Sequence, residues 1–278
     1  MKVLLLGKTG LLGSALFEAF EKAGHQVIAP SHEELDIEKK KSVQEEIARI
    51  APELVVNAVG YTNVDNAEQE QEKAFTLNSN GVAHLAYALH GTKIPLIHFS
   101  TDYIFDGTKA QGYTESDAPA PLSIYGASKG AGEFEIMNAL THYYIVRTSW
   151  LFGPGVKNFV DTMLTLAEKG EPIRVVTDQI GNPTYTPDLA QGVLRLLKGS
   201  AYGTYHMVNE GDTSWYDFAV EIFNQLGVPQ KILPITTAEL ARPAKRPHYS
   251  MLRSTKIPYL RPWKEALEAH LTNKQIII

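Results

Sequence analysis

The chain begins with Val3-Leu4-Leu5-Leu6-Gly7-Lys8-Thr9-Gly10-Leu11-Leu12-Gly13, and this stretch decides the fold. The apolar run has the length of a buried strand, the glycines permit a sharp turn, and an amphipathic helix is expected from Ser14 to Lys22. Glycines at this spacing let the backbone approach a pyrophosphate, whose charge is stabilised at the N-terminus of the helix. A tight strand-to-helix connection alone would need similar glycines. Because a strand precedes the turn and a helix follows it, the context favours a dinucleotide site.

Short apolar segments alternate with helical patterns through the first half of the chain. Strands are expected at Val3–Leu6, Val27–Ala29, Leu54–Asn57, Leu96–Ser100 and Tyr144–Arg147. Amphipathic helices are expected between them, at Lys41–Ile50, Ala67–Leu89 and Tyr125–Leu140. The alternation predicts an α/β fold, a Rossmann-type doubly wound parallel sheet with right-handed crossovers. Ligands of such sheets bind at the C-terminal ends of the strands, which here carry Gly7, Ala58-Val59-Gly60, Ser100-Thr101 and Ser149-Trp150.

The pattern becomes irregular after Trp150, where prolines and glycines separate shorter helices and strands. We therefore expect an NAD(P)-binding Rossmann domain at residues 1–150 and a smaller, mainly substrate-binding lobe at residues 151–278. The chain is expected to return to the sheet around residues 187–197. The terminal residues Gln275-Ile276-Ile277-Ile278 are unusually apolar, and no feature of the sequence explains them.

The composition is that of a soluble globular protein, with 278 residues, 44% of them hydrophobic and 21% charged. The net charge of -5 provides no electrostatic footprint for nucleic acid. The absence of cysteine excludes disulfides, thiolate metal sites and a cysteine nucleophile. The first apolar run is too short for a signal peptide or a membrane span, so a cytoplasmic location is expected. The nine histidines lack the spacing of metal ligands, and no residue is assigned to a metal.

The second expected strand bears on the choice of cofactor. It ends in Pro30-Ser31-His32, without the acidic residue that would hold the ribose hydroxyls of NAD and repel the extra phosphate of NADP. Lys8, in the glycine turn, is expected near that phosphate. We therefore expect NADPH as the cofactor with NADH also accepted, and Asp36 and Ile37 beside the adenine.

Tyr125 and Lys129 stand one helical turn apart, so their side chains share a face. A free phenol has a pKa of about 10, and a nearby ammonium favours the phenolate. The hydroxyl of Thr101, at the end of the fourth expected strand, would hold a substrate oxygen beside the phenol. A solvated Tyr/Lys pair on a helix would show the same spacing. Together with the glycine turn, the three residues predict a proton-donating site for carbonyl reduction.

Thr101, Tyr125 and Lys129, with the glycine turn, resemble the signature of the extended short-chain dehydrogenase/reductases. The closer resemblance, over nearly the whole chain and in the same order, is to the dTDP-4-dehydrorhamnose reductase family. It rests on Gly7-Lys8-Thr9-Gly10, Asn57 to Glu68, Ser100-Thr101-Asp102-Tyr103-Ile104-Phe105-Asp106-Gly107, Tyr125-Gly126-x-x-Lys129, Arg147-Thr148-Ser149-Trp150, Asp178-Gln179-x-Gly181-x-Pro183-Thr184 and Arg242-Pro243-Ala244-x-Arg246-Pro247.

The resemblance implies hydride transfer from NAD(P)H to the 4-keto carbon of dTDP-4-dehydro-L-rhamnose. It implies that Tyr125 protonates the developing alkoxide, that Lys129 binds the nicotinamide ribose and lowers the phenol pKa, and that Thr101 orients the ketone. Asp102 and Trp150 match positions that line the sugar pocket, with Thr101 and Tyr125. Asp102 as a helix cap and Trp150 as a core aromatic are the alternatives.

The same resemblance implies the residues at the cofactor and the partners. Arg242 and Arg246 would bind a diphosphate or be solvated loop charges. A homodimer is expected, and some relatives allow a divalent ion such as Mg²⁺ between subunits. The residues expected at the cofactor are Gly7, Thr9, Gly10, Leu11, Leu12, Gly13, Ser31, Asp36, Ile37, Ala58, Val59, Gly60, Tyr61, Tyr125 and Lys129.

Three other functions are consistent with these residues. The family also resembles the β subunit of methionine adenosyltransferase, so a non-catalytic, nicotinamide-nucleotide-binding regulatory subunit is one alternative. A nucleotide-sugar epimerase uses the same three side chains but keeps its cofactor bound throughout the cycle. A reductase of another nucleotide-activated keto sugar is the third.

Overall fold

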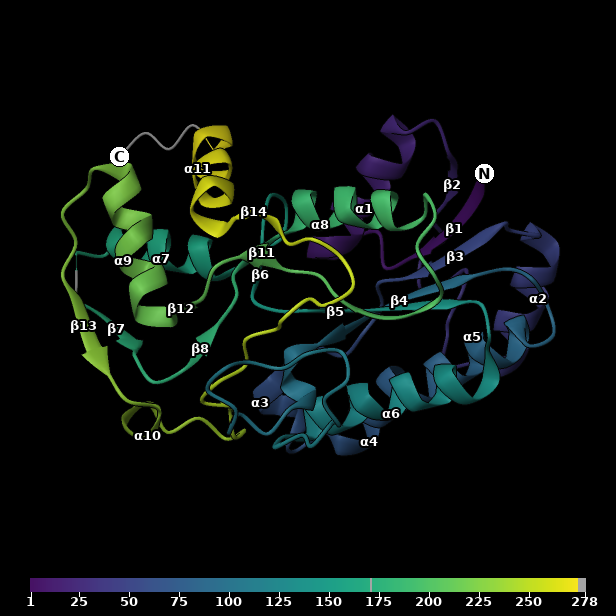
Figure 1. Ribbon diagram of the computed structural model, residues 1–278, viewed down its shortest axis with the longest axis horizontal. Coiled ribbons are helices and arrows are strands. Elements are labelled where there is room, and N and C mark those ends of the chain that lie inside the picture. The colour runs from purple at the N-terminus through teal and green to yellow at the C-terminus, as the bar shows by residue number, and fades with distance from the viewer. Residues whose placement is uncertain (171, 275–278) are drawn as a thin grey trace.

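A six-stranded, wholly parallel sheet forms the centre of the computed structural model, which describes residues 1–170 and 172–274. The apolar terminus from Gln275 lies outside the described residues. The strand order is β10-β5-β4-β3-β1-β2, so the predicted doubly wound sheet is confirmed (Figure 1). Its strands are β1 (Lys2–Leu6), β2 (Gln26–Ile28), β3 (Leu54–Asn57), β4 (Leu96–Thr101), β5 (Tyr143–Thr148) and β10 (Gly203–His206).

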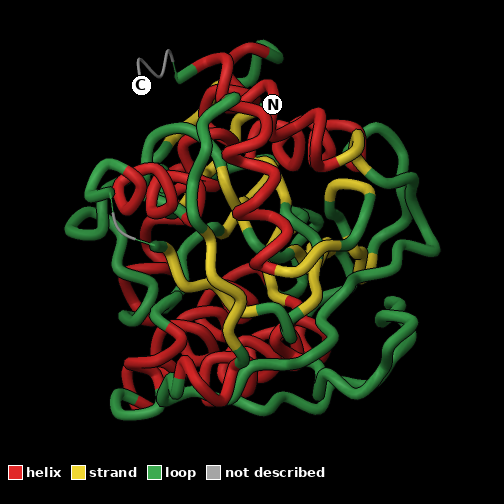
Figure 2. Tube along the Cα trace, turned by 90° about the vertical axis from the view of Figure 1, so that its left-hand side faces the viewer, coloured by secondary structure: helices red, strands yellow, loops and turns green. Residues whose placement is uncertain are grey.

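Helices cover both faces of this sheet, and the strands lie between the two groups (Figures 1 and 2). Successive residues of β1 point to opposite faces, so Val3 and Leu5 join one buried cluster while Leu4 and Leu6 join the other. Burial on both faces explains the continuous apolar run. No helix within residues 1–170 and 172–274 has the length and apolar character to cross a membrane. The helices are α1 (Leu11–Lys22) and α8 (Thr186–Leu196) on one face, and α2 (Lys40–Ile50), α5 (Gly81–Leu89) and α6 (Ile124–Ala139) on the other.

The helix expected at Ala67–Leu89 is not a single regular helix. The structure has α3 (Val64–Ala67), α4 (Gln71–Phe75), a π-helical turn η1 (Thr76–Asn80) and then α5. The buried amide of Asn78 lies in the π-helical turn, where it binds the backbone N–H and C=O of Tyr61 and the hydroxyl of Ser128. Such turns are common at functional sites, and this one anchors the loop after β3.

The second lobe lies beyond the C-terminal ends of the strands and has its own core around Phe152, Phe218 and Trp263. Between the segments that form this lobe the chain returns to the sheet, where α8 packs on α1 and β10 pairs with β5. The remaining elements are the 3-10 turn η2 (Asp102–Ile104), β6 (Leu151–Phe152), α7 (Phe159–Ala167), β7 (Ile173–Val176), β8 (Ile180–Gly181), β9 (Thr184–Tyr185), β11 (Asn209–Glu210), β12 (Thr213–Ser214), α9 (Trp215–Leu226), β13 (Ile232–Ile235), α10 (Thr237–Leu240), β14 (Leu260–Pro262) and α11 (Trp263–Asn273).

Candidate active site

Two adjoining cavities lie at the C-terminal ends of the strands, where open α/β sheets bind their ligands. The first, of about 520 Å³, follows the glycine turn and the end of β2. The second, of about 540 Å³, lies between β4, α6 and the second lobe. Both are lined by Gly10, Ala58, Val59 and Gly60, so they form one crevice. Its far end is lined by Val156 and Lys157 of the second lobe, which the sequence alone did not indicate.

The glycine turn has the geometry of a phosphate cradle. Gly7 has a φ of +85°, and a Cβ there would lie 2.8 Å from the carbonyl carbon of Ala58. Gly10 is the N-cap of α1 and leaves the first-turn N–H groups without a side-chain cap. Gly13 does not line either cavity; a Cβ there would lie 1.8 Å from the Gly7 oxygen, so this glycine allows the helix to pack on the turn.

Of the other residues expected at the cofactor, most line one of the two cavities and two line neither. Thr9, Ser31 and Ile37 line the first cavity, and Leu11 and Leu12 line the second. Asp36 and Tyr61 line neither.

The side chains of Asp36 and Tyr61 are instead held by local hydrogen bonds outside the two cavities. A carboxylate oxygen of Asp36 accepts from the N–H of Glu38 at 3.0 Å, and the Tyr61 hydroxyl donates to Glu70 at 2.6 Å.

The sequence did not indicate Glu34, which lies at the first cavity. Its carboxylate accepts the N–H of Ser31 at 2.8 Å, three residues earlier, and it lines the cavity near the end of β2. Lys8 lines the same cavity, with Nζ 3.4 Å from the centre of the Phe17 ring. The first cavity is therefore lined by an acidic and a basic side chain, whereas the sequence had indicated only the basic one.

Thr101, Tyr125 and Lys129 all line the second cavity. Thr101 is the last residue of β4, and Tyr125 and Lys129 lie in the first two turns of α6, whose N-cap is Ser123. The Thr101 hydroxyl donates to a carboxylate oxygen of Asp102 at 2.9 Å and accepts the N–H of Tyr103 at 3.1 Å. Thr101, and not Asp102, is therefore the cap of the turn η2.

The pKa of Tyr125 is raised in this structure, and not lowered as the sequence had predicted. Burial raises the pKa of Tyr125 to about 12, against a hydrogen bond to Thr101 that lowers it. Burial also lowers the pKa of Lys129 to about 8, against the charge of Glu133, which raises it. The Lys129 Nζ donates to the carbonyl of Phe99 at 2.6 Å. Desolvation of the phenolate therefore sets the direction of the shift in the pKa of Tyr125.

Several buried polar groups face the second cavity. Burial raises the pKa of Asp102 to about 6, while hydrogen bonds from Ser250 and Thr101 lower it. The hydroxyls of Ser100 and Thr148 are buried and have no hydrogen-bond partner among the described residues. Unpaired buried hydroxyls are uncommon in proteins, and here they suit a polar ligand such as a sugar.

Trp150 lines the second cavity in a strained conformation, with a φ of +45°. Its ring stacks on Trp215 at a centroid distance of 3.7 Å, and a Cβ at Gly181 would lie 2.5 Å from a ring carbon. Trp150 therefore packs against an aromatic residue of the second lobe and also lines the cavity, and its contact with a sugar stays a prediction. Trp215 is far away in sequence, and no motif pointed to it.

Arg246 is not a solvated loop charge. Its guanidinium makes two hydrogen bonds of 2.9 Å to the carboxylate of Asp65, and its side chain is 15% exposed. Arg242 lies 3.6 Å from the same carboxylate. The pairs attach the C-terminal segment to Asp65 in the first turn of α3.

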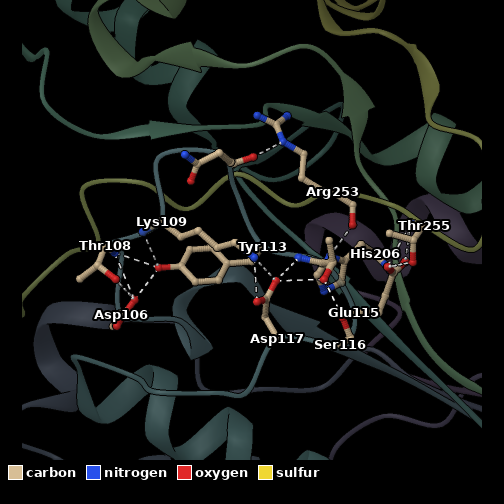
Figure 3. Close-up of polar contacts among 12 residues, drawn as sticks. Asp106, Thr108, Lys109, Tyr113, Glu115, Ser116, Asp117, His206, Arg253 and Thr255 are labelled. Atoms are coloured by element: carbon tan, nitrogen blue, oxygen red, sulfur yellow. Dashed lines mark hydrogen bonds and ion pairs between the residues drawn. The ribbon is translucent and has the colours of Figure 1, made fainter.

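The segment that joins Asp102 to Tyr125 is held by polar contacts (Figure 3). The Tyr113 hydroxyl bonds Asp106, and Lys109 pairs with Asp117 at 2.7 Å. Glu115 accepts the N–H of His206 in β10 and the hydroxyl of Thr255. These contacts attach the segment to β10 at the edge of the sheet and to Thr255 in the C-terminal part of the chain.

Comparisons with known proteins agree with this arrangement. The family model of the RmlD substrate binding domain matches residues 1–276. The chain is 41% identical to the spore coat polysaccharide biosynthesis protein SpsK of Bacillus subtilis, covering 98% of both, and 40% identical to a dTDP-4-dehydrorhamnose reductase of Aggregatibacter actinomycetemcomitans, covering 96% of this chain and 97% of the relative. The crystal structure of a dTDP-4-dehydrorhamnose reductase from Bacillus anthracis in complex with NADP is similar at a TM-score of 0.95 and 38% identity, covering 98% of this chain and 99% of that one. The chain therefore belongs to the dTDP-4-dehydrorhamnose reductase family.

Proposed function

We propose that the protein reduces the 4-keto group of dTDP-4-dehydro-β-L-rhamnose to give dTDP-L-rhamnose, with NADPH as the cofactor. The observation that carries the proposal is the meeting of Thr101, Tyr125 and Lys129 at a cavity continuous with the glycine turn. The relative from Bacillus anthracis supports it, because that protein binds NADP.

The first cavity fits a dinucleotide. The uncapped N-terminus of α1 and the backbone of Gly7 and Gly10 would hold the pyrophosphate. Ile37 would contact the adenine end, and Lys8 would attract a ribose phosphate. When bound, NADPH supplies the hydride. Glu34 adds a negative charge at the same end of the cavity, so a strict preference for NADPH is not expected. NADH should be used less well than NADPH, but measurably.

Tyr125 would act as the general acid. Its phenol is protonated at neutral pH and would donate this proton to the ketone oxygen as negative charge develops there. Burial raises the pKa of the phenol to about 12 and so makes it a weaker acid, which means that the transfer needs a charge that stabilises the phenolate. A charged Lys129 would stabilise the phenolate that remains. Thr101 and Asp102 would orient the sugar, and Trp150 would exclude water from the reacting centre, which strengthens every electrostatic interaction inside it.

The test is an assay of NADPH and NADH oxidation with dTDP-4-dehydro-L-rhamnose and with related nucleotide-activated keto sugars. Oxidation that is fastest with the rhamnose precursor supports the proposal. A faster reaction with another sugar would reassign the substrate. No oxidation with any sugar, together with co-purification of a larger partner, would indicate a regulatory subunit, and stoichiometric bound NAD would indicate an epimerase. The homodimer stays a prediction for light scattering to check.

A further inference from the structure

His98 lies beneath the second cavity and is completely buried, yet it has no place in the proposed reaction so far. It is in β4, directly beside Asn57 of β3 in the sheet register. Its Nδ1 is 3.1 Å from the Asn57 Nδ2, and its Nε2 is 3.5 Å from the Lys129 Nζ. The imidazole therefore connects the end of β3 to the amine of the candidate site.

The backbone determines which way the Asn57 amide points. The N–H of Val59 donates to the Asn57 Oδ1 at 3.0 Å, and a backbone N–H can only donate. The amide nitrogen must then face His98, and an amide nitrogen also only donates. The hydrogen-bond network thus assigns the Nδ1 of His98 as an acceptor, so the proton of a neutral imidazole is on Nε2.

This tautomer directs an N–H at the amine of Lys129. An ammonium has three donors and no lone pair, so it cannot accept from the imidazole, whereas a neutral amine can. The neutral amine would accept from His98 and donate to the Phe99 carbonyl, which lies at 2.6 Å. The contact of 3.5 Å is at the outer limit of a hydrogen bond, so a small movement of Nζ makes or breaks it.

We propose that His98 is a positioning residue for Lys129, whose neutral amine it holds through its Nε2–H, and that protonation of the amine breaks this contact and turns Nζ toward the cavity. The open side is the second cavity, which Lys129 and Gly60 both line. The inference rests on the proposed function, in which the charged amine serves the reaction.

The other charged or titratable groups around Lys129 act differently. Tyr125 and Glu133 lie one turn before and after it on α6, and Glu133 is paired with Arg147 of β5 at 2.7 Å. Glu133 raises the pKa of Lys129, and burial lowers it to about 8. Burial also keeps the pKa of His98 well below its ordinary value, so the imidazole stays neutral while Lys129 titrates.

The first test is independent of turnover. Long-range ¹H–¹⁵N NMR spectra of the ¹⁵N-labelled full chain distinguish the two neutral tautomers and the imidazolium, and His98→Asn identifies the signal. We expect the Nε2–H tautomer at neutral pH. Asn57→Asp replaces the amide donor by an acceptor while keeping the bond to Val59, so it should reverse the tautomer to Nδ1–H. A wild-type Nδ1–H tautomer, or no reversal in the variant, would overturn the proposal even if the enzyme is active.

The second test uses the pH profile of kcat/KM for NADPH, which reports the free enzyme. Both His98→Asn and Asn57→Asp remove the N–H that donates to the neutral amine of Lys129. The neutral form is then less stable and the pKa of Lys129 rises, so the alkaline limb of the profile should move up by about one pH unit. His270→Asn is the matched control, because His270 is also buried but lies in α11 of the second lobe. An alkaline limb that stays in place in both site variants would also overturn the proposal, whereas an inactive wild type would contradict the proposed function alone.

Discussion

Tyr125 and Asp102 show how burial determines the chemistry of single residues in the second cavity. Both groups have raised pKa values because their charged forms are poorly solvated. For Tyr125 this makes the phenol a weaker acid, so the proposed proton transfer depends on a charge that stabilises the phenolate. For Asp102 the ionised form, which lines the second cavity, is present only at a cost to the stability of the folded state.

Tyr125→Phe should reduce kcat by about 10²–10⁴-fold, because the phenol is the proposed general acid. The dissociation constant of NADPH should change little, since the ring and its edge contact with Tyr103 remain. Tyr103→Phe is the matched control, as it removes a neighbouring phenol that does not line the cavity. Equal activities of the two variants, from steady-state NADPH oxidation, would remove Tyr125 from its role.

Asp102→Asn should stabilise the protein above neutral pH while reducing activity. The folded pKa of about 6 lies above the ordinary 3.8, so the folded state binds more protons between these values and loses stability as pH rises through them. The amide removes this cost, with an expected gain on the order of 1–3 kcal/mol at about pH 8 and less at about pH 4.5. Urea unfolding at both pH values measures the gain. An equal effect at both would show that Asp102 is not the titrating group.

At the scale of elements, the β1-turn-α1 unit combines two kinds of glycine. Gly10 lines both cavities, and a Cβ there would lie 3.3 Å from the Gly7 oxygen, a tight contact, whereas Gly13 has no space for one. The first glycine therefore faces the crevice, and the second allows the helix to pack on the turn.

Gly13→Ala should lower the free energy of unfolding by about 1–3 kcal/mol, because the turn must shift to admit the methyl group. Gly10→Ala should cost less stability but weaken NADPH binding, since the methyl group faces the cavity. Thermal unfolding and fluorescence titration with NADPH separate the two effects. The reverse ranking in stability would show that the turn is not packed as described.

At the scale of the molecule, the crevice depends on contacts between distant segments. Asp65 and Arg246 hold the C-terminal segment against the sheet domain, and the strap from Asp106 to Asp117 meets β10 and Thr255 (Figure 3). Trp150 reaches the cavity through its stack on Trp215.

Arg246→Ala should cost about 1.5–3 kcal/mol of stability, because it removes two charge-assisted hydrogen bonds from a mostly buried carboxylate. Arg242→Ala should cost under about 1 kcal/mol, since Arg242 is 55% exposed and its contact is longer. Urea unfolding of both variants tests the difference. Similar losses would mean that the carboxylate is held by either arginine.

The sequence by itself determined the features that arise from local periodicity. The apolar run into the glycine turn predicted β1 and α1, the alternation predicted the sheet, and the four-residue spacing put Tyr125 and Lys129 on one face. Most residues expected at the cofactor do line the crevice, because the C-terminal ends of parallel strands meet at one edge.

Only the tertiary structure decided the features that depend on distant neighbours and on burial. The π-helical turn at Asn78 follows from its bonds to Tyr61 and Ser128, and the place of Glu34 follows from its bond to Ser31. The raised pKa of Tyr125 could not be foreseen, because desolvation depends on the atoms packed around a group, and these come from segments that are far apart in the chain.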